Sequence, residues 1–152
     1  MTNRYLRFPE GDSEFLRATF AYHNPMANKY GEAAIRAARQ IPKASGDALA
    51  HWQDAVLALY PTSPIAQKKG GPRGAFLGLC EAGLVRDVPA GTPSKGSPNK
   101  KFATDAVALL RAGSCPATVN ALWREVTGGA DIVHNSQMDV VLALWKNNLI
   151  VK

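Results

Sequence analysis

The segment QKKGGPRG, residues 67–74, combines residue types that can hold a phosphate group. Lys68, Lys69 and Arg73 supply positive charge beside a predicted helix start, where free backbone N–H groups and the helix dipole favour an anion. The segment is not a nucleotide-binding P-loop, because the pattern G-x-x-x-x-G-K followed by Ser or Thr is absent. The alternative interpretation is a solvated basic loop that holds no ligand.

Most of the excess positive charge lies in the middle of the chain. Residues 61–101 contain seven Lys and Arg residues against two acids, a net charge of +5, whereas the whole chain of 152 residues carries +6. A localised positive field attracts polyanions, and the attraction weakens with salt. This region therefore predicts association with nucleic acid through phosphate contacts from Lys68, Lys69, Arg73, Lys95, Lys100 and Lys101.

Residues 108–125, ALLRAGSCPATVNALWRE, resemble a helix-turn-helix segment. Gly113 stands at the turn, and Asn120 and Arg124 are predicted to face outward from the second helix. Asparagine and arginine are the side chains that read adenine and guanine edges, so these two are the expected base-reading residues if binding depends on sequence. Against this, Ser114 occupies a turn position that is usually apolar, and helix pairs with a glycine turn also occur in proteins that do not bind DNA.

A second function class fits the same charge pattern. The basic centre would equally suit a protein–protein interaction module that docks an acidic partner without catalysis. An exposed apolar patch would favour this alternative, and a phosphate at the Pro72 helix start would favour nucleic acid.

The residues that usually carry metal or nucleophilic chemistry are scattered. No two of the histidines and cysteines have the close spacing of paired zinc ligands, so neither a metal nor another cofactor is expected. No local motif marks Cys80 or Cys115 as an activated nucleophile, and both are predicted to be free thiols. We therefore expect a non-enzymatic protein. A small enzyme would require a deep cleft with convergent titratable groups.

Apolar spacing and capping residues predict an all-α fold with about seven helices and little or no strand. The first helix begins at Asp12 or Ser13 and ends before Asn24-Pro25. Pro72 and Gly83 mark the first turn and the left-handed end of the fourth, and Ser136 with Asp139 forms a capping-box variant for the last. The other expected helices cover approximately residues 30–41, 47–60, 101–112 and 116–127.

Two parts of the chain resemble each other. Residues 29–39 align with 101–111 and residues 76–85 with 141–150, and a tryptophan helix lies between the members of each pair. The pattern predicts two similar three-helix units packed about a pseudo-twofold axis, although any two amphipathic helices share part of such a pattern. We expect residues 1–152 to form one compact domain, with units 29–85 and 101–152 joined by a basic Pro/Gly/Ser linker at 86–100.

The distribution of hydrophobic residues predicts the residues of the core and the location of the protein in the cell. The longest apolar runs are only a few residues, and charged residues interrupt the N-terminus, so we expect a soluble, cytoplasmic protein without a membrane partner. The oligomeric state cannot be derived from the sequence. The predicted core consists mainly of Trp52, Val56, Phe76, Leu79, Phe102, Leu122, Trp123, Leu142 and Trp145.

Overall fold

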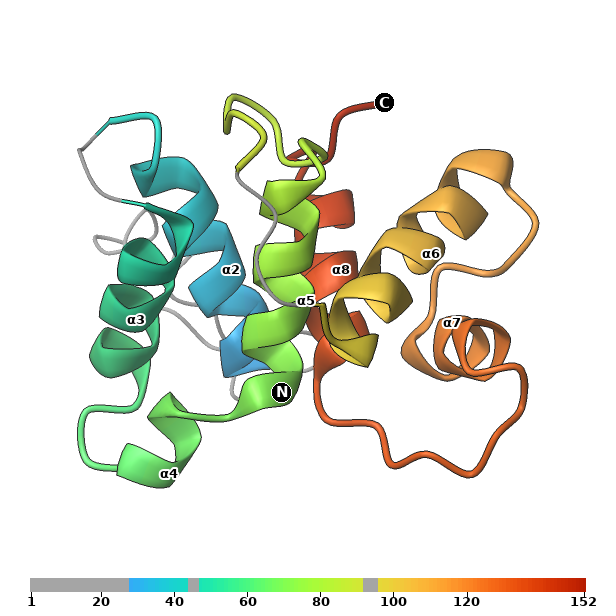
Figure 1. The fold of residues 1–152 in the computed structure, drawn as a ribbon, viewed down its shortest axis with the longest axis horizontal. Helices are drawn as coiled ribbons and strands as arrows, with labels where there is room; N and C mark the ends of the chain where they lie inside the picture. Colours follow the sequence, from blue (N-terminus) through green and yellow to red (C-terminus); the bar gives the residue numbers. More distant parts are fainter. Residues whose placement is uncertain (1–27, 44–46, 92–95) are drawn as a thin grey trace, which may run out of the picture.

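The computed structural model describes residues 28–43, 47–91 and 96–152, and these residues are mostly helical (Figure 1). The described helices are α2 (Lys29–Gln40), α3 (Ala48–Leu59), α4 (Pro64–Gln67), α5 (Gly70–Glu81), α6 (Pro98–Ala112), α7 (Val119–Val126) and α8 (Gln137–Lys146). The all-α prediction is confirmed. The predicted first helix lies outside the described residues, and the described helices match the other six predictions with the addition of short α4.

Local signals explain where most helices begin and end. Asn28 accepts a hydrogen bond from Gly31 N and caps α2, and Asp47 does the same for Ala50 N at the start of α3. Gly83 ends α5 with a left-handed φ of 74°, as predicted.

Three predicted boundaries are corrected. Residues 64–67 were expected to be a loop, but Ser63 accepts a hydrogen bond from Ala66 N and Pro64 stands in the first turn, so α4 forms. Helix α6 begins at Pro98 rather than residue 101, again with proline in its first turn. Helix α7 begins at Val119 rather than residue 116, because its capping residue is Thr118.

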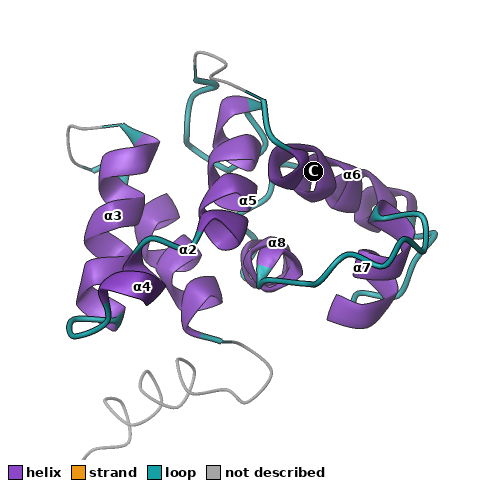
Figure 2. Cartoon of the chain, turned by 60° about the horizontal axis from the view of Figure 1, so that its bottom comes forward, coloured by secondary structure: helices purple, strands orange, loops and turns teal. Residues whose placement is uncertain are grey.

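Helices α5 and α8 pack against each other in the middle of the described structure. Helices α2 and α3 lie on one side of this pair and α6 and α7 on the other, as Figure 1 and Figure 2 show. The arrangement depends on small side chains, because the predicted alanine face of α2 is at most 1% exposed and allows close helix approach. No helix among the described residues has the length and apolar character needed to cross a bilayer.

The core is continuous across these helices. Trp52 stacks on Phe76 with ring centroids 5.2 Å apart, and both side chains are at most 1% exposed. Phe102 and Trp145 were expected in the core but are only partly buried and pack against its edge. Sequence reasoning missed several fully buried residues of the last helix and the strand-like tail after it: Met138, Val140, Val141, Leu144 and Ile150.

The segments that follow α5 and α8 pair with each other. Arg86 N donates to Leu149 O at 2.7 Å, and Val151 N donates to Leu84 O at 2.8 Å. The alignment of residues 76–85 with 141–150 is a shift of 65 positions, and the same shift relates Leu84 to Leu149 and Arg86 to Val151, so each hydrogen bond is the counterpart of the other. An antiparallel bridge joins Val85 to Ile150 between them. The pairing is what a pseudo-twofold axis would produce, and internal duplication stays a prediction.

Candidate functional site

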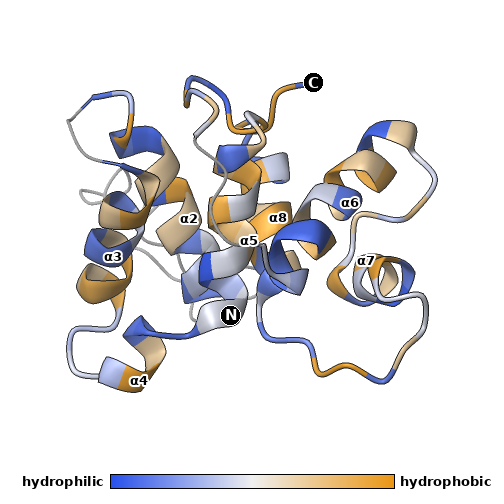
Figure 3. Cartoon of the chain, viewed as in Figure 1, coloured by the Kyte–Doolittle hydropathy of each residue, from blue (hydrophilic) through white to orange (hydrophobic). Residues whose placement is uncertain are grey.

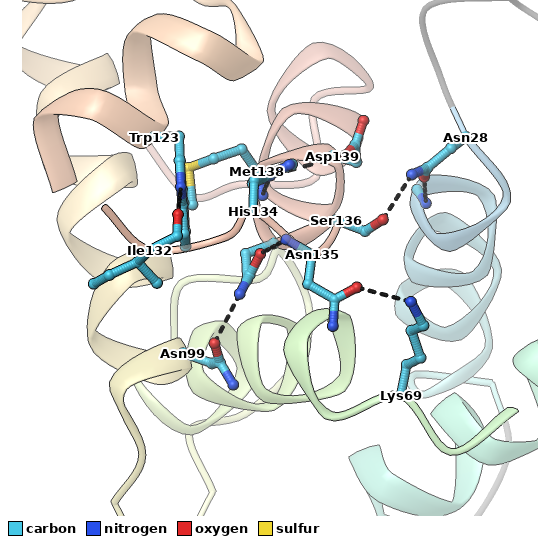
Figure 4. A network of polar contacts seen from close by, with 12 residues as sticks. Asn28, Lys69, Asn99, Trp123, Ile132, His134, Asn135, Ser136, Met138 and Asp139 are labelled. Carbon is cyan, nitrogen blue, oxygen red and sulfur yellow. Dashed lines mark hydrogen bonds and ion pairs between the residues drawn. The ribbon is translucent and has the colours of Figure 1, made fainter. Parts of the chain in front are cut away.

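Four helices begin around one short segment, residues 134–137, of sequence HNSQ (Figure 4). Asn28, at the start of α2, donates from Nδ2 to Ser136 Oγ at 3.0 Å. Asn99, in the first turn of α6, accepts from Gln137 Nε2 at 2.9 Å. Gly71, in the first turn of α5, packs against Asn135, and α8 itself begins at Gln137. We call this segment and the first turns of α2, α5, α6 and α8 the N-terminal junction.

The backbone contributes positive partial charge at the junction through the helix dipoles. Each helix has the positive end of its dipole at its N-terminus, and two of the four helices carry side-chain caps there: Asn28 caps Gly31 N in α2, and His134 caps Met138 N in α8. Four such ends lie around the HNSQ segment, where their dipoles favour an anion, and the acidic side chains of Glu32 and Asp139 in the first turns of α2 and α8 offset part of this effect.

Gly71 allows the HNSQ segment to lie directly on α5. A Cβ atom added at Gly71 would lie 2.7 Å from Asn135 O and 3.1 Å from Asn135 Cβ. On the other side of this contact, Lys69 Nζ donates to Asn135 Oδ1 at 3.2 Å. Asn135 is therefore held between the α5 backbone and the Lys69 side chain.

Gln137 fixes the same segment to α6. Its side chain is 4% exposed, and its Oε1 accepts from Asn135 N at 2.6 Å. Its Nε2 donates to Asn99 Oδ1, and Asn99 Nδ2 in turn reaches Gly70 O at 3.5 Å. Sequence reasoning missed Gln137, although a polar residue at the first position of a mostly apolar helix was the available signal.

The last helix is capped by His134 and not by the predicted Ser136 capping box. Ser136 adopts a left-handed φ of 64° and forms no side-chain cap, because an N-cap residue normally needs an extended backbone. Instead, Met138 N donates to His134 Nε2 at 3.1 Å. The acceptor role of Nε2 requires a neutral imidazole with its proton on Nδ1.

Burial favours the neutral form of His134. It lowers the pKa of the imidazole below its ordinary value, and the nearby Asp139 only partly offsets this effect. Burial also raises the pKa of Asp139, whose Oδ2 lies 4.0 Å from His134 Nε2. The Trp123 ring meets the imidazole edge-on with centroids 4.9 Å apart, and Trp123 Nε1 donates to Ile132 O at 2.9 Å.

Three of the predicted phosphate-binding residues gather at the junction. Lys68 and Lys69 lie in the connection between α4 and α5 and are exposed, and Arg73 is half-buried in the first turn of α5. Figure 3 shows the stretch between α4 and α5 as hydrophilic. Among the described residues, no carboxylate forms an ion pair with any of the three.

The other predicted lysines have carboxylate partners. Lys100 packs on Gly78, and its Nζ lies 3.0 Å from both carboxylate oxygens of Glu81. Lys101 Nζ lies 2.7 Å from Asp105 Oδ2, an exposed pair one helical turn apart. Lys95 lies outside the described residues. Lys100 and Lys101 therefore add little uncompensated charge to the junction.

Asn120 and Arg124 do not join the cations of the junction. Both are exposed on α7, one turn apart, and Figure 1 places α7 on the opposite side of the molecule from α4. The connection from α6 to α7 spans residues 113–118, which is longer than the turn of about 3–4 residues in helix-turn-helix motifs. The structure thus separates the predicted base-reading residues from the predicted phosphate-binding ones.

Burial opposes activation of the Cys80 thiol. Both cysteines are free, and burial raises the pKa of the Cys80 thiol to about 12, with a smaller contribution from Glu81. A thiol with so high a pKa is a poor nucleophile at neutral pH. Within the described part of the chain, no group of three His, Cys, Asp or Glu side chains is placed to hold a metal ion.

Comparison with known proteins gives one match. Residues 27–151 match the model of a family described as "Family of unknown function (DUF6979)". No curated protein and no solved structure matches the chain significantly.

Proposed function

Because the match spans most of its length, the chain belongs to this family of unknown function, DUF6979, and we propose that it binds nucleic acid through phosphate contacts at the N-terminal junction. Lys68, Lys69 and Arg73 are the proposed phosphate ligands. The observation that carries the proposal is their position at a point where four helices begin.

The charges at the junction support this choice over the other basic positions. Lys69 donates to a neutral amide, so its interaction with Asn135 orients the ammonium group without neutralising it. Two acidic side chains belong to the helix starts of the junction: Glu32 is 5% exposed in α2, and Asp139 faces His134. A phosphate backbone can thus meet three cations and several helix N-termini on one surface.

Recognition of bases would involve a different part of the molecule, helix α7. Asn120 and Arg124 are exposed and one helical turn apart, which suits contact with base edges in a groove. Their distance from the junction in the fold means that phosphate binding does not depend on them. We therefore propose phosphate binding that is mainly independent of sequence.

The test compares two triple variants with equal loss of charge. Lys68→Gln/Lys69→Gln/Arg73→Gln removes the cations of the junction. Arg111→Gln/Lys146→Gln/Lys152→Gln removes three cations from the C-terminal ends of α6 and α8 and from the chain end. Fluorescence anisotropy with labelled duplex DNA, over a series of salt concentrations, gives the affinity and its salt dependence.

The wild-type affinity should fall steeply with salt. Each lost phosphate contact lowers the slope of log K against log salt by about 0.9, so the junction variant should lose about 2–3 from the slope. The control variant should keep the wild-type slope. Failure of the wild-type protein to bind duplex or single-stranded DNA at low salt, or equal losses in both variants, would contradict the proposal.

One observation favours the alternative of an acidic protein partner. Ile65 is 80% exposed three residues before Lys68, and Val133 is 83% exposed two residues before Asn135. Apolar side chains beside cations suit a protein surface more than a phosphate backbone. The variant Ile65→Ser/Val133→Ser separates the two proposals, because DNA affinity should not change in it. Binding of polyglutamate that is tighter than binding of DNA would support the protein partner.

A further inference from the structure

A second site lies away from the junction, in a cavity of about 620 Å³ between α2 and α3. The cavity is lined by the C-terminal half of α2, the residues just after it, and one side of α3. Its volume falls within the range of about 300–1,000 Å³ that is typical of small-molecule sites. It is too small for a folded partner and too far along α2 to belong to the N-terminal junction.

The charged groups in the cavity wall are mostly positive. Arg39 and Lys43 are exposed in the wall, and Arg36 lines it one turn earlier on the same helix. Neither Arg39 nor Lys43 forms an ion pair with a described residue. Asp54, on α3, is the one carboxylate among the described residues of the wall. The wall therefore has a surplus of positive charge, which favours an anionic ligand.

The rest of the wall restricts the body of that ligand. None of the described lining residues is Phe, Tyr or Trp, and the imidazole of His51, which is 9% exposed, is the one ring among them, so the wall offers little ring surface on which a nucleobase would stack. The small side chains of Ala37, Ala55 and Ala58 leave space for the ligand in the cavity. Gln40 and Asp54 can form hydrogen bonds with its hydroxyl groups. A carboxylate in an otherwise cationic wall can accept hydrogen bonds from the hydroxyl groups of a ligand that also carries negative charge.

We propose that this cavity binds a small phosphorylated sugar or polyol. Arg39 and Lys43 bind its phosphate, with Arg36 lining the same wall, and Asp54 and Gln40 bind its hydroxyl groups. The site is distinct from the nucleic-acid surface at the junction and does not depend on that function.

Isothermal titration calorimetry on the full chain tests the proposal with glycerol phosphate, ribose phosphate and glucose phosphate as probes. At least one of them should bind the wild-type protein with a Kd below about 10 mM. Arg39→Gln/Lys43→Gln should weaken that binding about tenfold or more, because two charge-assisted contacts are lost. The matched control Arg111→Gln/Lys146→Gln, which removes the same charge elsewhere, should leave it unchanged.

Asp54→Asn identifies the hydroxyl contact. This variant should bind the sugar phosphates more weakly, because the hydroxyl contact is lost. It should bind inorganic phosphate as tightly as the wild type or more tightly, because a negative charge is removed from the wall. The proposal is overturned if none of the three probes binds, if Arg39→Gln/Lys43→Gln and its control behave alike, or if Asp54→Asn affects both kinds of ligand equally. Circular dichroism of each variant shows whether it is folded, and the DNA-binding assay reports separately on the junction.

Discussion

Replacing Gly78 by alanine should destabilise the protein, although alanine is the better helix former. Gly78 lies inside α5 at the place where α6 crosses it. A Cβ atom there would lie 2.7 Å from Lys100 Cα, 2.8 Å from its Cβ and 3.0 Å from its Cγ. The nearest atom belongs to the backbone of α6, so the clash cannot be relieved by rotating a side chain.

The expected magnitude follows from two opposing effects. Alanine in place of glycine inside a helix contributes about 1 kcal/mol of stability. Forcing an additional methyl group into a closely packed contact costs about 1–3 kcal/mol, and a clash with backbone belongs to the upper part of that range. The net loss in the free energy of unfolding is thus about 1–2 kcal/mol, which lowers the Tm of a chain of this length by about 3–6 °C.

Thermal unfolding followed by far-UV circular dichroism measures this loss, with Gly70→Ala as the control. A Cβ at Gly70 would have as its nearest neighbour Arg73 Nη2 at 3.5 Å, an ordinary contact, so its Tm should change little. A Gly78→Ala protein at least as stable as the wild type would show that α5 and α6 do not pack as described.

Substitutions at three further positions test the junction and the end of the last helix. The wild-type protein should lose stability as the pH falls from about 7 to 5, because burial lowers the pKa of the His134 imidazole and the unfolded chain therefore binds a proton before the folded chain does. His134→Gln should reduce this loss, and urea unfolding over the same pH range measures it. Asn148, at a φ of 62°, should tolerate glycine, whereas alanine should cost about 1 kcal/mol in the same assay. Gly71→Ala should displace Asn135 and speed hydrogen exchange of its amide, while unchanged exchange would mean that the segment does not rest on α5.

The features that could be predicted from the sequence depend on residues close together in the chain. Asp47 caps α3 through the amide three residues later. Gly83 and Asn148 follow their helices in the left-handed conformation, which glycine and asparagine adopt more readily than other residues. The earlier start of α6 followed the same kind of signal, because Pro98 suits a first helical turn. Local chemistry decides such positions, so the sequence is sufficient for them.

The features that could not be predicted depend on the tertiary structure. Lys100 contributes little free charge because its ammonium group meets Glu81, which lies on another helix. Ser136 is no cap because its backbone is left-handed and His134 takes the role. The convergence of four helix starts involves residues from Asn28 to Gln137, and no single window of sequence contains it.

The junction also lies where the two units that the sequence predicts to be similar differ from each other. The hydrogen bonds that pair Leu84–Arg86 with Leu149–Val151 follow the predicted symmetry. The connections from α3 to α5 and from α7 to α8, residues 60–69 and 127–136, are equal in length but different in structure. The first contains helix α4 and the two lysines, whereas the second is irregular and ends in the HNSQ segment. The two connections meet at the hydrogen bond between Lys69 and Asn135, so the proposed phosphate-binding surface combines two segments that would be unlike even if the internal duplication holds.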